Sequence, residues 1–150
     1  MSFQKAHQIS NELGEVVVQS AIKTLSNGDP ISLDFPPVFK NYRVLELGFV
    51  VINDTASSNL TLEFGTSATG SEFISLTSAI TIAANSSGTK FSTAVGTFDF
   101  NAAGTGAIDS DGVPELTSGQ QVHVDVNTPA SAGTEAVFFA RLAPNIEYKG

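Results

Sequence analysis

The chain has 150 residues, a formal net charge of −8 and 15% charged residues, against roughly 25% in an average globular protein. This length suits one domain with one continuous core, and the 41% hydrophobic content argues against disorder. The seven basic residues are scattered from Lys5 to Lys149, which argues against nucleic acid and against an anionic membrane as partners. Without cysteine there is no disulfide, thiolate metal site or cysteine nucleophile.

Residues 1–14, MSFQKAHQISNELG, are expected to form an arm outside the folded body. Four apolar side chains are spaced as one face of a helix: Phe3, Ala6, Ile9 and Leu13. Gly14 could cap such a helix, and an extended arm is equally compatible with the composition. The arm has no apolar core of the kind that a signal peptide needs, and the chain has no apolar run that could span a bilayer. We therefore expect a soluble product made in the cytoplasm.

The remainder, residues 15–150, is predicted to be β throughout. The segment 15–25 is rich in β-branched residues and stops at the turn signal NGDP, residues 27–30. A short strand of alternating polarity follows at 31–35 and ends before two prolines.

Residues 42–53, YRVLELGFVVIN, form the most apolar segment. Both faces of the predicted strand are apolar: Leu45, Leu47, Phe49 and Val51 on one, and Val44, Val50 and Ile52 on the other. A strand of this kind is either central in a sandwich or lies under a contact between subunits.

Later strands are predicted at 60–64, 73–74, 80–82, 90–100, 122–126 and 136–142. Within 90–100, Gly96 is predicted to form a β-bulge, because the apolar phase shifts there. The segment 101–119, rich in Gly, Asp and Ser, is predicted to be a long loop. About eight antiparallel strands at this spacing predict an all-β fold, a single-domain jelly roll or β-sandwich with an N-terminal arm.

The loop FGTSATGSEFI places Gly65 and Gly70 five residues apart, as in a phosphate-binding loop. That motif requires a lysine after the second glycine and then a helix. Here Ser71 and Glu72 follow, and a strand comes next, so a turn between strands is favoured.

His123 and Asp125 lie two apart on a predicted strand, so both project from one face, where a nearby serine could complete a hydrolase triad. No G-x-S-x-G elbow accompanies them, and polar residues that alternate with valines are typical of any half-buried strand. We therefore predict no enzymatic activity and no catalytic residue.

The stretch Asp109-Ser-Asp111-Gly112 resembles the start of a calcium loop, but the later ligands of such a loop are missing. A solvated acidic turn is favoured and calcium binding is left open. We predict no metal site and no cofactor.

The order of these features carries a family resemblance. It rests on three stretches: EVVVQSAIKTLSNGDPISLDFP, VLELGFVVINDTASSNLTLEFGTSATGSEFISLTSAI and SGQQVHVDVNTPASAGTEAVFFARL. Across roughly residues 13–143, the chain resembles the small jelly-roll decoration (cement) proteins of tailed-bacteriophage heads.

This resemblance implies a structural protein made in the bacterial host cytoplasm and bound to the outer surface of the virion capsid. It would be a homotrimer that ties neighbouring copies of the major capsid protein together. The arm would contact the capsid through four residues: Phe3, Lys5, His7 and Ile9. Four others are predicted at the trimer interface, although burial inside one sandwich explains them equally well: Tyr42, Leu47, Phe49 and Val51.

Two other functions remain open, a carbohydrate-binding β-sandwich module and a head-fiber base protein. Sugar platforms usually use exposed aromatic side chains, and the chain has no Trp and only two tyrosines, Tyr42 and Tyr148. A β-sandwich enzyme is a further alternative, and it would depend on His123.

Overall fold

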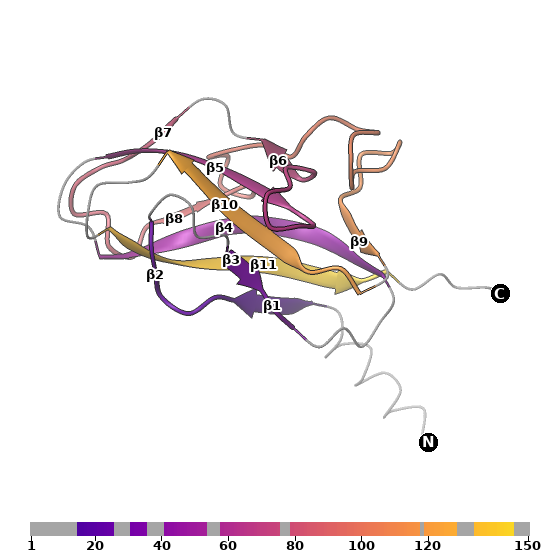
Figure 1. Cartoon of the computed structure of the whole chain (residues 1–150), viewed down its shortest axis with the longest axis horizontal. Helices are drawn as coiled ribbons and strands as arrows, with labels where there is room; N and C mark the ends of the chain where they lie inside the picture. The colour runs from indigo at the N-terminus through magenta and orange to yellow at the C-terminus, as the bar shows by residue number, and fades with distance from the viewer. Residues whose placement is uncertain are drawn as a thin grey trace, which may run out of the picture.

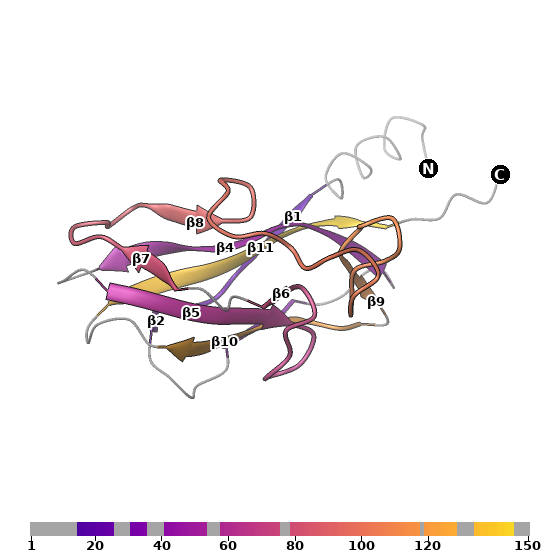
Figure 2. The same cartoon turned by 90° about the horizontal axis from the view of Figure 1, so that it is seen from above.

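The computed structural model describes residues 15–25, 31–35, 41–53, 58–75, 79–117, 119–128 and 134–145. These residues form two antiparallel sheets that pack face to face, as the two layers in Figure 2 show. Within these ranges every regular element is a strand, so the predicted all-β sandwich is confirmed. None of the described segments is a helix of the length and apolarity needed to cross a membrane. The predicted arm, residues 1–14, lies outside the described residues.

The six-stranded sheet has four strands on its main path and two short strands beside it (Figure 1). The main path runs β1 (Val16–Gln19), β11 (Glu135–Pro144), β4 (Asn41–Asn53) and β8 (Lys90–Ser92). β2 (Lys23–Thr24) pairs with β11, and β9 (Glu115–Thr117) pairs with β4.

The five-stranded sheet is built in the same way. Its main path runs β3 (Ile31–Leu33), β10 (Val122–Thr128), β5 (Ser58–Gly65) and β6 (Ile74–Ser75), and β7 (Ile80–Ile82) pairs with β5. When the eight main-path strands are numbered along the chain, the sheets have the orders 1-8-3-6 and 2-7-4-5. This pairing of the first strand with the last, and of the second with the seventh, is the topology of a jelly roll.

The core lies between the sheets and is filled from alternate positions of the long strands. In β11 the inward side chains are Ala136, Phe138, Ala140 and Leu142, all fully buried. The Phe138 ring lies 5.5 Å from that of Phe49 on β4 and 6.3 Å from that of Phe64 on β5, so aromatic contacts join the two sheets.

A β-bulge corrects the predicted faces of the strand at 42–53. Arg141 pairs with Glu46 and Leu142 pairs with Val44, so Leu45 is an extra residue in β4. The side-chain alternation therefore changes phase at Leu45. Val44 faces the core together with Phe49, whereas simple alternation had placed these two residues on opposite faces.

Two strand predictions and one loop prediction were wrong in their bounds. The segment 15–25 contains two strands, β1 and β2, and the loop predicted at 101–119 contains β9. β8 ends at Ser92, where the chain turns back and the Thr97 amide donates to the Ser92 carbonyl oxygen at 3.0 Å. Gly96, with φ of 79°, lies in this turn and not in a bulge of a longer strand.

Candidate functional site: the outer face of the six-stranded sheet

The side of the six-stranded sheet that points away from the core is unusually apolar. We call it the apolar outer face and define it by nine residues: Val17, Gln19, Glu46, Val50, Ile52, Lys90, Val137, Phe139 and Arg141. They line one shallow depression of about 390 Å³.

Strand register brings these side chains together in rows. Three cross-strand sets are Val17–Arg141–Glu46, Phe139–Gly48–Ser92 and Val137–Val50–Lys90. The Lys90 ammonium nitrogen also lies 5.9 Å from the centre of the Phe139 ring, within the range of a cation–π contact. The face is thus one continuous surface built from four strands.

Gly48 determines how closely β8 can approach β4. A Cβ atom at this position would lie 2.3 Å from the carbonyl oxygen of Phe91 and 2.5 Å from the Cβ of Ser92, both on β8. Real Cβ atoms essentially never make contacts this short, so only glycine permits the observed pairing.

The apolar outer face exposes side chains that would usually be inside a protein. Val17 is 54% exposed and Ile52 is 40% exposed. Val50, Val137 and Phe139 are half-buried. Contiguous exposed apolar surface on a soluble protein marks a contact with another molecule more often than scattered apolar residues do.

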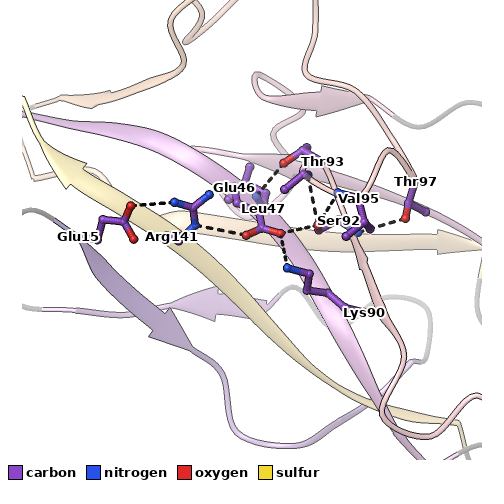
Figure 3. Close-up of polar contacts among 10 residues, drawn as sticks. Glu15, Glu46, Leu47, Lys90, Ser92, Thr93, Val95, Thr97 and Arg141 are labelled. Atoms are coloured by element: carbon purple, nitrogen blue, oxygen red, sulfur yellow. Dashed lines mark hydrogen bonds and ion pairs between the residues drawn. The ribbon is translucent and has the colours of Figure 1, made fainter.

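A network of ion pairs and hydrogen bonds around Glu46 lies at one end of this face (Figure 3). Glu46 is only 4% exposed. Its Oε2 accepts a hydrogen bond from Ser92 Oγ at 2.5 Å and forms an ion pair with Lys90 Nζ at 3.0 Å. Its Oε1 pairs with Arg141 Nε at 3.3 Å, and Arg141 Nη1 reaches Glu15 Oε1 at 2.9 Å. The contacts run from Glu15, the residue before β1, through β11 and β4 to β8, so the network joins three strands and the start of a fourth.

The pKa of Glu46 is lowered from its ordinary value of 4.5 by this network. Burial alone would raise the pKa, because it penalises the charged form. The hydrogen bonds from Ser92, Lys90 and Arg141, together with the charge of Lys90, outweigh burial. Glu46 is therefore ionised at neutral pH, and the network gives the face a charged border.

The four residues predicted at a trimer interface lie in the core of the single chain. Leu47, Phe49 and Val51 have no exposed surface, and Tyr42 is 4% exposed with its ring 5.3 Å from that of Phe35. Burial inside one sandwich accounts for all four, and a contact between copies through them stays a prediction. The four residues predicted to contact the capsid lie outside the described residues: Phe3, Lys5, His7 and Ile9.

Only part of the apolar outer face is visible in the sequence. In β4 the sign of it is that both faces of the predicted strand are apolar, and this strand includes Val50 and Ile52. Val137 and Phe139 carried the same signal, since they alternate with inward residues that are also apolar. Single-chain packing does not require apolar side chains at these outward positions.

The glycine-rich loop is a turn, as predicted. Glu72 folds back over it and accepts hydrogen bonds from the Thr66 amide at 3.2 Å and the Thr66 hydroxyl at 3.0 Å. The Glu72 Oε2 atom lies 2.2 Å from the positions that a Cβ would take at Gly65 and at Gly70. A carboxylate therefore fills the space that a phosphate would need.

His123 and Asp125 lie on β10, and His123 pairs in register with Ser32 on β3. The Ser32 hydroxyl donates to Asp34 Oδ1 at 2.5 Å and not to the imidazole. The arrangement found here therefore does not activate Ser32 as a nucleophile.

The acidic stretch at Asp109 is a hydrogen-bonded turn. Its Oδ1 accepts from the backbone amides of Asp111 and Val113, each at 2.9 Å. In the part of the chain that the structure describes, no group of three His, Asp or Glu side chains is placed to hold a metal ion.

Comparisons with known proteins add little. No protein family matches the sequence, and no curated protein matches it. Among solved structures, a chain titled "Cyanophage Pam1 capsid asymmetric unit" is similar, with 15% identity and a TM-score of 0.49 over 85% of this chain and 82% of that chain. A likeness this weak does not determine the function of this chain.

Proposed function

We propose that this protein is a structural virion protein that decorates the outside of a phage head. It binds as a homotrimer and stabilises the contacts between neighbouring major capsid proteins. The observation that carries the proposal is the apolar outer face, which presents exposed Val17 and Ile52 on one sheet of the jelly roll. The family resemblance of the sequence supports the same role.

The physical basis is binding without chemistry. Covering apolar surface contributes roughly 25 cal/mol for each Å² removed from water, and a face of this kind supplies such surface in one continuous piece. A protein that binds the expanded lattice better than the unexpanded one stabilises the expanded lattice by linkage. The Glu46 network supports this role because it holds the strands under the face in one fixed arrangement.

The N-terminal arm adds a second contact in this proposal. Phe3 and Ile9 provide apolar anchors and Lys5 a cation, while His7 lies between them in the sequence. A segment that orders only on docking can follow the lattice over a wider area than a compact body can.

A carbohydrate-binding role has less support. Tyr42 is buried in the core with 4% exposure, so it does not offer a ring for a sugar to stack on. A glycan array separates the two functions, because specific glycan binding by the isolated chain would favour a lectin-like module.

The direct test is co-sedimentation of the purified chain with expanded and unexpanded heads of the phage that encodes it. The proposal expects saturable binding to expanded heads, weaker binding to unexpanded heads, and slower disruption of decorated heads by heat. Light scattering tests the trimer separately, with an expected mass of three times 15.6 kDa. Failure to bind either form of the head would contradict the proposed function.

A further inference from the structure

The apolar outer face lies next to the place where residues 1–14 join the body. Glu15 Oε1 pairs with Arg141 Nη1 at 2.9 Å, and Arg141 is one of the residues that define the face. Val17, two residues further along β1, also belongs to it. The N-terminal segment therefore starts from the border of an apolar surface that no described residue covers.

We propose that residues 1–14 of the same chain fold back over the apolar outer face and cover it while the protein is free. This inference rests on the proposed function in one respect only, namely that docking on the head is the event that displaces the segment. The packing itself concerns the isolated protein.

The chemistry of the segment matches that of the face. Its apolar residues Phe3, Ala6, Ile9 and Leu13 recur at helical spacing and would share one side of a helix. The opposite side of the same helix would carry Gln4, Gln8 and Asn11, which are uncharged and polar. One side is thus suited to apolar contact and the other to water.

The lengths also agree. A helix over residues 2–13 would be about 18 Å long at 1.5 Å per residue. Along β4 the face extends from Glu46 to Ile52, which is about 20 Å at 3.4 Å per residue. To lie over the face the chain must reverse just before β1, and Gly14 stands there, the residue type that accepts the backbone angles of a tight reversal.

A tethered segment has an advantage over any separate molecule. A short flexible connection gives it an effective concentration on the order of millimolar at the face. In dilute solution this favours the chain's own segment over that of a separate molecule. Within the proposed trimer the own segment still has the shortest connection, because Glu15 already lies at the border of the face, so the proposal commits to packing within one chain.

Because the sequence contains no cysteine, a cross-linking test can introduce cysteines at chosen positions alone. One variant combines Ile9→Cys with Val137→Cys, which joins the apolar side of the segment to the face. The matched control combines Gln8→Cys with Val137→Cys, which differs only in the side of the predicted helix. Both are oxidised by glutathione disulfide in dilute solution and analysed on non-reducing gels and by mass spectrometry.

The expected result is an internal disulfide in the Ile9 variant that forms at least about tenfold faster than in the Gln8 control. Equal rates in the two variants would overturn the proposal. So would a disulfide that forms only between chains when a single Ile9→Cys protein is mixed with a single Val137→Cys protein, since the face would then receive the segment of a neighbouring copy.

A second measurement needs no substitution in the body. Deletion of residues 2–13 should raise the fluorescence of an apolar dye such as ANS several-fold while the circular dichroism spectrum stays that of a β-sandwich. A paired variant, Phe3→Asp with Ile9→Asp, should reproduce this increase, and Gln4→Asp with Gln8→Asp should not. Unchanged dye binding after the deletion would contradict the inference even if the chain binds heads as proposed.

Discussion

The two sheets of this jelly roll have similar inner faces and different outer faces. On the inner side both carry apolar residues at alternate positions, such as Val124 on β10 and Phe138 on β11. On the outer side β10 carries His123 and Asp125, whereas β11 carries Val137 and Phe139. Core packing explains the apolar inner faces of both sheets. It does not explain why the outer faces differ, so this difference points to function.

Electrostatics reinforces this difference. On the five-stranded sheet Asp125 lies directly opposite Glu63, and two like charges in that position repel each other unless water screens them. On the six-stranded sheet Glu46 instead meets Lys90 and Arg141 within 3.3 Å. One outer face is thus suited to water, and the other combines an apolar surface with fixed opposite charges.

The largest expected effect comes from Phe49, which tests whether β4 serves the core or a contact between copies. We expect Phe49→Asp to destabilise the fold by more than about 4 kcal/mol, since it removes a fully buried ring and buries an unpaired charge. Chemical denaturation followed by circular dichroism measures this. A folded, soluble monomer would instead place Phe49 at the predicted trimer interface.

Gly48→Ala should have the next largest effect. Its new methyl group would lie within 2.5 Å of β8 atoms, and we expect a loss of about 2–3 kcal/mol as β8 is pushed away from β4. Hydrogen exchange should show that the amides of β8 exchange faster in Gly48→Ala than in the wild type, while the amides of β10 exchange at the same rate in both. Unchanged protection of β8 would show that the sheet absorbs the methyl group without separating these strands.

Glu46→Gln should cost about 1–2 kcal/mol, because hydrogen bonds to a charged carboxylate are replaced by weaker ones and Lys90 and Arg141 are partly exposed to water. The wild type should also show a pH dependence that the variant lacks. Since the folded pKa of Glu46 is lowered, its contribution is complete above 4.5, the ordinary value, and is lost as the pH falls through the folded value.

Unfolding midpoints measured in urea between pH 3 and pH 7 test this point. The difference between wild type and Glu46→Gln should be constant near neutrality and should shrink below pH 4.5, the ordinary carboxyl value. A difference that stays the same across this range would show that the ionised carboxylate does not stabilise the fold.

The fold was largely predictable from the sequence, because the outward–inward alternation in β10 and β5 and the turn signals between strands are local. The bulge at Leu45 was not predictable, since it depends on the pairing of β4 with β11 and reverses the alternation only from that point. The Glu46 network was missed for the same reason, because its partners Lys90 and Arg141 are distant in sequence.

The candidate surface was only half predictable. Apolar residues on both faces of β4 indicated either a central strand or a subunit contact, and the structure shows that the inward set satisfies the core. The outward set, including Val50 and Ile52, then needs another explanation. Sequence alone could not separate the two sets, because it does not show which alternate positions of β4 point inward before and after the bulge.

Of the substitutions considered, one on the apolar outer face should have the smallest effect on stability and the largest effect on binding. Val17→Asp and Val95→Asp are a matched pair, because both valines are 54% exposed and only Val17 lines the apolar outer face. Both substitutions should change stability by less than about 0.5 kcal/mol, as is usual for exposed sites.

If the apolar outer face binds the phage head, as proposed, these two variants should differ in co-sedimentation with expanded heads. We expect Val17→Asp to weaken binding at least about tenfold, equivalent to about 1.4 kcal/mol, while Val95→Asp should bind as the wild type does. Equal binding by the two variants would contradict the proposal.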